Sequence, residues 1–220
     1  MKKIPKMSRF VLGFTKLTGI LPAYILFKPK VFTVSKKAKR RLPKKAILMS
    51  NHTSLLDFVL FLVVFFTRSI HFLIAEVLFS KNKLLSWFLY KIGGIFVNRN
   101  SGDFSFIEDS LDVLNKNGVV GVFPQGRLPI NGQQFPYKPG IVLIALKTDS
   151  PIIPVYTDGN YGIFKRAHIM IGEEIHIKDY LDSSEITDEK IKELTKILEE
   201  KNFALKEELE KRLKKNNERK

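Results

Sequence analysis

Cysteine is absent from the 220 residues, and tryptophan occurs only once. Without cysteine the chain has no disulfide, no thiolate nucleophile and no Cys-ligated zinc, so any nucleophilic chemistry must use oxygen or nitrogen. The four histidines show no metal-ligand spacing. We therefore expect neither a metal nor a resident cofactor.

Acidic residues are absent from residues 1–45, which contain fourteen lysines and arginines. This segment accounts for nearly all of the formal net charge of +15, so an anionic partner is expected. It also has an apolar run at residues 10–27, flanked by basic residues and interrupted by Lys16 and Pro22. That combination suits an anionic phospholipid membrane, and no nucleic-acid-binding motif accompanies it. We expect a membrane-association segment over residues 1–45 and no nucleic-acid partner.

Residues 10–27 could span a membrane, lie in its surface, act as a signal peptide or, beyond these three interpretations, be buried in the core. A membrane-spanning helix needs roughly 20 apolar residues, so the charge of Lys16 and the break at Pro22 favour two short helices lying in the membrane surface. A signal peptide would need a small-residue cleavage site, and none follows Pro22. A helix simply buried in the protein core is a further possibility. The favoured interpretation implies a peripheral or monotopic protein on the cytoplasmic side of the cell membrane.

Apolar strands and helices alternate through the middle of the chain. Strands are expected at residues 46–50, 72–75, 94–97, 118–123 and 152–156, and helices at 55–66, 84–92, 104–115 and 140–147. This order predicts an α/β fold with a largely parallel sheet flanked by helices, and active residues at the carboxyl ends of the strands. We expect a catalytic domain over residues 46–183. Residues 184–220 should form a charged amphipathic helix that packs through Ile191, Leu194, Leu198, Leu205 and Leu209.

A histidine precedes an aspartate by five positions where the strand at 46–50 meets the next helix. On one continuous helix His52 and Asp57 would point about 140° apart. With His52 in the loop and Asp57 in the first helical turn, the carboxylate can face the imidazole, fix its tautomer and stabilise the imidazolium. The flanking Asn51 and Ser54 are candidates for substrate binding, and Ser54 also favours the helix N-terminus.

Three further blocks follow at Gly93–Arg99, Phe123–Arg127 and Ile152–Val155. Together with His52 and Asp57, these blocks resemble, in order and distance, the lysophospholipid acyltransferases typified by 1-acylglycerol-3-phosphate acyltransferase. The resemblance spans residues 46–155. It implies that His52 and Asp57 form the family's catalytic His-x4-Asp motif and that Arg99 binds the phosphate of the acceptor.

The third block departs from the family pattern Phe-Pro-Glu-Gly-Thr-Arg. Gln125 replaces the glutamate, Arg127 replaces the threonine, and Leu128 stands at the position of the arginine. Guanidinium groups bind phosphate in bidentate fashion, and a glycine lets the backbone approach an anion. Gln125, Gly126 and Arg127 are therefore candidate substrate-binding residues.

Two more positions bear on the acceptor site. The basic residue of Lys138-Pro139-Gly140 matches a feature that often follows the third block, so Lys138 is also a candidate substrate-binding residue. Glu76 lies near the position where the family tends to have a lysine. His71, His168 and His176 have no evident partner and are expected to be structural or exposed.

The resemblance implies transfer of a fatty acyl group from acyl carrier protein or acyl-CoA to the sn-2 hydroxyl of 1-acylglycerol-3-phosphate, which forms phosphatidic acid in phospholipid biosynthesis. The altered third block leaves another lysophospholipid, or an acylated amino acid, open as the acceptor. A non-catalytic protein that binds anionic membranes is the alternative from another class.

Overall fold

The computed structural model describes residues 7–99, 102–162, 164–181 and 186–218. Lys2, Lys3 and Lys6, and the expected domain boundary at residues 183–184, lie outside this part of the chain. In the described residues, seven strands form one sheet in the order β1 (Lys30–Thr33), β7 (His168–Ile171), β6 (Ile152–Thr157), β2 (Ala46–Ser50), β5 (Val119–Val122), β3 (Ile70–Ala75) and β4 (Ile95–Val97). Neighbouring strands are parallel except β6 and β7, so β1 and β7 run opposite to the other five.

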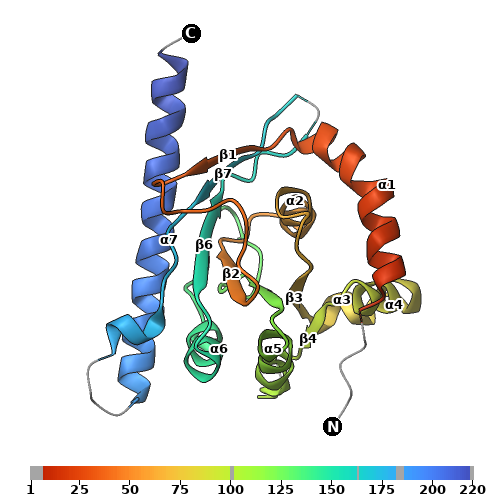
Figure 1. The fold of residues 1–220 in the computed structure, drawn as a ribbon, viewed down its shortest axis with the longest axis vertical. Helices are drawn as coiled ribbons and strands as arrows, with labels where there is room; N and C mark the ends of the chain where they lie inside the picture. The colour runs from red at the N-terminus through yellow and green to blue at the C-terminus, as the bar shows by residue number, and fades with distance from the viewer. Residues whose placement is uncertain (1–6, 100–101, 163, 182–185, 219–220) are drawn as a thin grey trace.

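Helices cover both faces of this sheet (Figure 1). α5 (Ser105–Asn115), α6 (Gly140–Thr148) and α7 (Asp188–Asn217) cover one face, and α1 (Arg9–Phe27) and α2 (Asp57–Val64) cover the other. The short helices α3 (Glu76–Ser80) and α4 (Lys83–Lys91) lie between β3 and β4, and the 3₁₀ helix η1 (Ile177–Tyr180) precedes α7. The expected α/β fold with a largely parallel sheet is confirmed.

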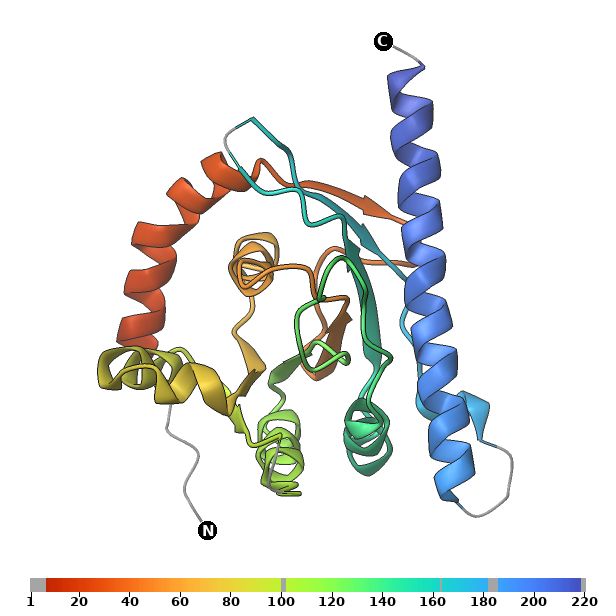
Figure 2. The same cartoon turned by 180° about the vertical axis from the view of Figure 1, so that it is seen from behind.

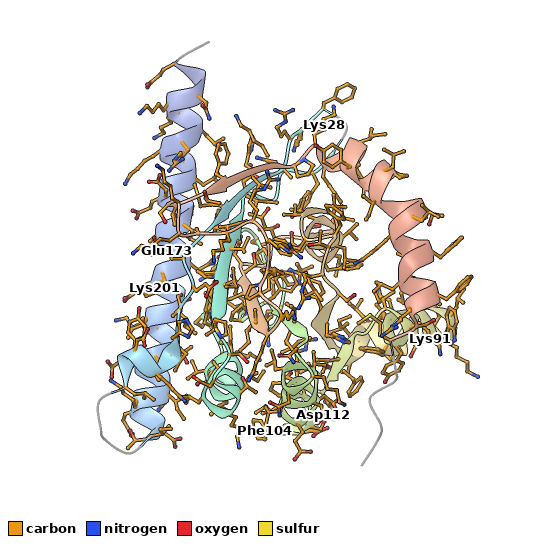
Figure 3. All side chains as sticks on the ribbon, in the orientation of Figure 1. Lys28, Lys91, Phe104, Asp112, Glu173 and Lys201 are labelled. Carbon is orange, nitrogen blue, oxygen red and sulfur yellow. The ribbon has the colours of Figure 1, made fainter. Side chains whose placement is uncertain are left out.

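Strand β2 shows how the alternating pattern divides the core. Ile47 and Met49 point into the cluster beneath α5, α6 and α7, whereas Ala46 and Leu48 point into the cluster beneath α1 and α2. All five β2 residues are buried, as expected for a central strand covered on both faces. Side chains from both layers fill the interior around this strand (Figure 3).

The sequence missed strands β1 and β7 and helix α3. β1 is the important omission, because it lies within the segment 1–45 that was assigned to membrane association and yet pairs in parallel with β7. Ala38 and Leu42, farther along that segment, are also buried. The strand was not predicted because basic residues flank its short apolar stretch. Residues 1–45 therefore contribute both a surface helix and part of the core of the fold.

α1 is one continuous helix, not the two short helices expected from Pro22. Ser8 caps its start by accepting a hydrogen bond from the amide of Val11, and Lys28 ends it in a left-handed conformation. Beyond the proline, Ala23 and Phe27 are buried against the body of the protein, and this packing outweighs the hydrogen bond that Pro22 cannot donate. Figure 3 places Lys28 where α1 leads into β1.

The outer surface of α1 is strongly apolar. Exposed side chains recur at intervals of three and four residues, with Phe10 and Leu17 more than four-fifths exposed; they are Phe10, Phe14, Leu17, Leu21 and Tyr24. We call these five residues the α1 stripe. Within the described residues, α1 is the one helix long and apolar enough to cross a membrane, and little of it is buried in the protein.

The C-terminal helix α7 packs as the sequence predicted. Leu194, Leu198, Leu205 and Leu209 are buried, while Ile191 packs at the edge of the same core. Asn202 adds a hydrogen bond of 2.8 Å from its side-chain amide to the carbonyl of Val155 in β6. Figures 1 and 2 show α7 crossing the side of the molecule opposite α1, with its C-terminal end extending beyond the sheet.

Candidate active site

His52 lies in the loop that leaves the carboxyl end of β2, and Asp57 is the first residue of α2. The turn between them brings His52 Nδ1 within 2.7 Å of Asp57 Oδ2. This is the arrangement that the spacing of five predicted. Because Nδ1 is held by the carboxylate, Nε2 is the ring nitrogen left to accept a proton.

The Asp57 side chain is fully buried and accepts hydrogen bonds on both oxygens. Oδ2 accepts from His52 and from the amides of Thr53, at 2.7 Å, and Ser54, at 2.9 Å. Oδ1 accepts from the hydroxyls of Thr53, at 2.8 Å, and Tyr161. Burial alone would raise the pKa of Asp57, but these hydrogen bonds, led by the one from His52, hold its pKa below the ordinary value. Asp57 is therefore a carboxylate at neutral pH.

The imidazole of His52 is held between this carboxylate and an aromatic ring. Phe123, just after β5, stacks on it with ring centroids 4.2 Å apart and an angle of 13° between the planes. The backbone amide of His52 donates a 3.0 Å hydrogen bond to Oε1 of Gln125. The imidazole thus has little rotational freedom, and its side chain is 16% exposed, so one edge remains accessible.

Gln125 and Asn51 both help to hold the loop that carries His52, Gln125 through the His52 amide and Asn51 through the backbone of β6. Gln125 is almost fully buried, and its Nε2 donates to Gln134 at 3.1 Å. Asn51 is buried too, and its side-chain amide both donates to and accepts from the backbone of Thr157, each at 2.9 Å. We therefore assign Asn51 to holding the loop and not to the substrate-binding role expected from its position.

Ser54 lies in the same loop, and its hydroxyl accepts a hydrogen bond from the amide of Leu56 at 3.2 Å. Its own amide donates to Asp57. Ser54 thus shapes the turn before α2 but does not cap the helix, whose N-cap residue is Leu56 and has no side-chain cap hydrogen bond.

A cavity of about 290 Å³ lies at the carboxyl ends of β3, β4 and β5. Its volume is near the lower end of the ~300–1,000 Å³ typical of small-molecule sites. Phe123 joins the two features, because the ring that stacks on His52 also lines the cavity. The interior is apolar and lies between the sheet and helices α5 and α6; it includes Leu73, Val97, Phe106, Val122, Ile141 and Leu143.

Cationic side chains lie among the polar lining residues of this cavity. Arg99, Gly126 and Lys138, three of the candidate substrate-binding residues, are among those that line it. Arg99 Nη1 donates to the carbonyl of Gly126 at 2.8 Å, and its Nε lies 3.4 Å from Glu76 Oε2. Gly126 has φ +68°, a left-handed conformation that favours glycine, and a side chain there would meet the Lys138 chain at 3.4 Å. Arg99 and Lys138 therefore line the cavity on either side of a closely packed glycine.

Arg127 does not join this group. Its side chain is exposed, and its guanidinium lies over the ring of Phe135 at 4.8 Å from the centroid. Arg127, a candidate substrate-binding residue, is therefore not among the residues that line the cavity, whereas Arg99 is.

Two functional residues escaped the sequence analysis. Tyr161 donates to Asp57 from the loop after β6, and Thr53 contacts the same carboxylate through both its amide and its hydroxyl. A threonine beside the histidine could have been flagged as a capping residue. Tyr161 has no sequence signal, because it lies 104 residues from Asp57 and belongs to no motif.

His168 also differs from expectation, because it has an acidic partner. Its Nδ1 lies 2.7 Å from Oδ2 of Asp158, across the antiparallel turn from β6 to β7. His71 bonds the carbonyl of Gly93 at 2.9 Å, and burial lowers the pKa of its imidazole. His176 is half exposed, as expected. Over the described parts of the chain, no group of three or more histidine, aspartate or glutamate side chains could hold a metal ion.

The sequence of this chain is similar to those of known proteins. A family model described as Acyltransferase matches residues 31–158. The chain is 26% identical over 164 residues to 1-acyl-sn-glycerol-3-phosphate acyltransferase from Borreliella burgdorferi, covering 71% of this chain and 65% of that protein. It is 26% identical over 165 residues to the enzyme of that name from Cocos nucifera, covering 70% of this chain and 49% of that protein. The chain thus spans less than two thirds of the length of these relatives.

The fold has a counterpart among solved structures. The crystal structure of the 1-acyl-sn-glycerophosphate (LPA) acyltransferase PlsC from Thermotoga maritima superposes with a TM-score of 0.60. The sequences are 22% identical, and the match covers 90% of this chain and 78% of that chain.

Proposed function

Because the chain belongs to the Acyltransferase family, we propose that it transfers a fatty acyl group from a thioester to the sn-2 hydroxyl of 1-acylglycerol-3-phosphate, forming phosphatidic acid. The observation that carries this proposal is the His52–Asp57 pair, 2.7 Å apart, whose imidazole stacks on a ring that also lines an apolar cavity with cationic residues.

The chemistry follows from the geometry of the pair. Nε2 of His52 takes the proton of the acceptor hydroxyl as the oxygen attacks the thioester carbonyl, and Asp57 stabilises the imidazolium that forms. The tetrahedral intermediate collapses by breaking the carbon–sulfur bond. The imidazolium then returns its proton to the thiolate, so the products are an ester and a free thiol, with no covalent acyl-enzyme. No resident cofactor enters this mechanism.

The acceptor headgroup meets Arg99 and Lys138. Two cations suit a phosphate, but Glu76, which pairs with Arg99, reduces the positive charge there. A second acceptor class, another lysophospholipid or an acylated amino acid, is favoured by this carboxylate and by the outward position of Arg127. The acyl donor is the acyl thioester of acyl carrier protein or of coenzyme A.

We further propose that the α1 stripe contacts an anionic phospholipid membrane, with the protein bound peripherally or monotopically on the cytoplasmic side of the cell membrane. Exposed aromatic and leucine side chains over this length would be costly in water and favourable among lipids. The basic residues at 36–45 precede β2, so they lie at the end of the sheet opposite His52. Lys16, inside α1, donates to the carbonyls of Phe66 and Arg68 and so points toward the body of the protein. Arg9 and Lys28 lie at the two ends of α1.

The test is thioester-dependent acylation of a panel of acceptors by the purified protein. The panel contains 1-acylglycerol-3-phosphate, lysophosphatidylethanolamine and an N-acylated amino acid. Each acceptor is tested with acyl-CoA and with acylated acyl carrier protein as the thioester donor. The proposal expects the phosphate monoester to be the best acceptor and His52→Ala to abolish transfer. Absence of transfer to every acceptor, or a His52→Ala protein that keeps most of its activity, would refute the assignment.

A further inference from the structure

A side-chain hydrogen bond joins the two ends of the loop between β6 and β7. Asp158 follows β6 and His168 begins β7, and their side chains meet at 2.7 Å. Asp158 also accepts hydrogen bonds from the amides of Asn160, at 3.1 Å, and His168, at 3.0 Å. The two ends of the loop are thereby held together, which limits how far the residues between them can move.

On one side this loop packs against the catalytic loop. Gly159 has φ +69°, and a side chain there would come within 2.7 Å of the Thr53 hydroxyl. Two residues later, the Tyr161 hydroxyl donates to Oδ1 of Asp57. Burial and the adjacent Asp57 carboxylate raise the pKa of Tyr161, so the phenol stays protonated and remains a donor.

On its other side the loop is joined to the end of α1. The Tyr161 ring meets that of Phe27 edge to face, with centroids 5.3 Å apart and planes at 68°. Phe27 is the last residue of α1 and is almost fully buried, and its carbonyl accepts a 2.9 Å hydrogen bond from the amide of Ala167. Figure 2 shows the end of α1 next to this loop.

We infer that Tyr161 is a positioning residue for acyl transfer: its hydroxyl fixes the Asp57 carboxylate that orients His52, and Phe27 at the end of α1 fixes the Tyr161 ring. The inference rests on the proposed function of the His52–Asp57 pair. Oδ2 of Asp57 receives three N–H donors, whereas Oδ1 receives only the hydroxyls of Thr53 and Tyr161. Without Tyr161, Oδ1 keeps the Thr53 hydroxyl, which can itself rotate, so the carboxylate plane is held less firmly about its broad terminal torsion and His52 is oriented less firmly with it.

The first test compares Tyr161→Phe with Tyr180→Phe. Both substitutions remove one phenolic hydroxyl, but Tyr180 lies in η1, and its ring sits beneath Lys201 on the far side of the sheet. We expect Tyr161→Phe to lower kcat about 10- to 100-fold, the range for a hydrogen bond to a charged group, with the KM of both substrates unchanged. Tyr180→Phe should match the wild-type protein. Equal kcat for the wild type and Tyr161→Phe would overturn the inference.

The second test asks whether Phe27 acts through the Tyr161 hydroxyl. Phe27→Leu keeps an apolar side chain but removes the edge-to-face contact. We expect it to lower kcat in the wild-type background and to cost nothing further in the Tyr161→Phe background, because the hydroxyl it positions is then absent. An equal loss in both backgrounds would show that Phe27 acts only through general packing.

A spectroscopic measurement separates failure of the inference from failure of the proposed function. Nitrogen-15 NMR of the His52 ring reports which nitrogen carries the proton, whatever the substrate. The wild type should show a single form protonated at Nδ1, and Tyr161→Phe a mixture of tautomers, at a temperature well below unfolding for both. Identical His52 spectra would overturn the inference even if no acceptor is acylated, whereas altered spectra with an inactive wild type would overturn only the proposed function.

Discussion

Asp57→Asn separates the charge of Asp57 from its shape. The asparagine oxygen can take the place of Oδ2 and still accept from His52 and the amides of Thr53 and Ser54, none of which can turn away. The amide NH₂ then takes the place of Oδ1, where the hydroxyls of Thr53 and Tyr161 can rotate to accept instead of donate. The backbone and the His52 tautomer are therefore expected to survive the substitution.

The rate loss should then measure charge alone. A unit charge about 4 Å from the imidazolium is worth about 4 kcal/mol at an effective dielectric constant near 20, which bounds the loss at about 10³-fold. Since the imidazolium is only partly formed in the transition state, we expect kcat to fall about 10²- to 10³-fold. His52→Ala should lose more, because no base remains.

The assay is steady-state kinetics with both substrates saturating, alongside His52→Ala and with folding checked by thermal unfolding. An Asp57→Asn protein as active as the wild type would refute the role of the carboxylate in stabilising the imidazolium. A loss equal to that of His52→Ala would show that the amide fails to preserve the His52 tautomer.

Three further predictions can be checked with the same protein. Arg99→Ala should raise the acceptor KM about tenfold or more and leave the donor KM unchanged, whereas Arg127→Ala should leave both KM values unchanged. Steady-state kinetics with each substrate varied in turn measures this, and equal effects of the two substitutions would contradict the outward position of Arg127. Replacing Phe14 and Leu17 of the α1 stripe with glutamate should abolish sedimentation with anionic vesicles at high salt yet preserve turnover of short-chain, monomeric lysolipid, and undiminished sedimentation would place the membrane contact elsewhere. Hydrogen bonding depresses the pKa of Asp57 in the folded state, so its contribution to the free energy of unfolding should be complete above about pH 5 and lost as the pH falls toward the folded pKa. Urea unfolding measured as a function of pH should show that Asp57→Asn loses less free energy of unfolding on acidification than the wild type. Parallel curves for the two proteins would refute the pKa shift.

The core of the active site could be read from the sequence because its spacing has only one productive geometry. A buried apolar strand followed by His52, and a helix beginning at Asp57, leave the two side chains facing each other. The central strands were equally clear, since β2 and β6 are apolar over most of their length and bounded by turns or charges. The local sequence pattern was sufficient to predict a contact or an element wherever the interacting residues are close in the sequence.

The features that the sequence did not yield depend on contacts between distant segments. Pro22 indicated a break in α1, but burial of Phe27 under the β6–β7 loop keeps the helix continuous. Tyr161 reaches Asp57 only because β6 lies beside β2 in the sheet. Arg127 was assigned to the phosphate by its residue type, whereas the direction of its side chain depends on Phe135.

The pairing of β1 with β7 also has a consequence for synthesis. Lys30 aligns with His168, so the strand that follows α1 has no partner until 138 more residues have left the ribosome. During that interval helix α1 has been synthesised but the sheet against which it packs has not, so both its inner and its outer apolar faces are exposed. Pairings of such large sequence separation form slowly, so the nascent helix has time to meet a lipid surface first. The rest of the enzyme would then fold onto a helix that is already in place at the membrane.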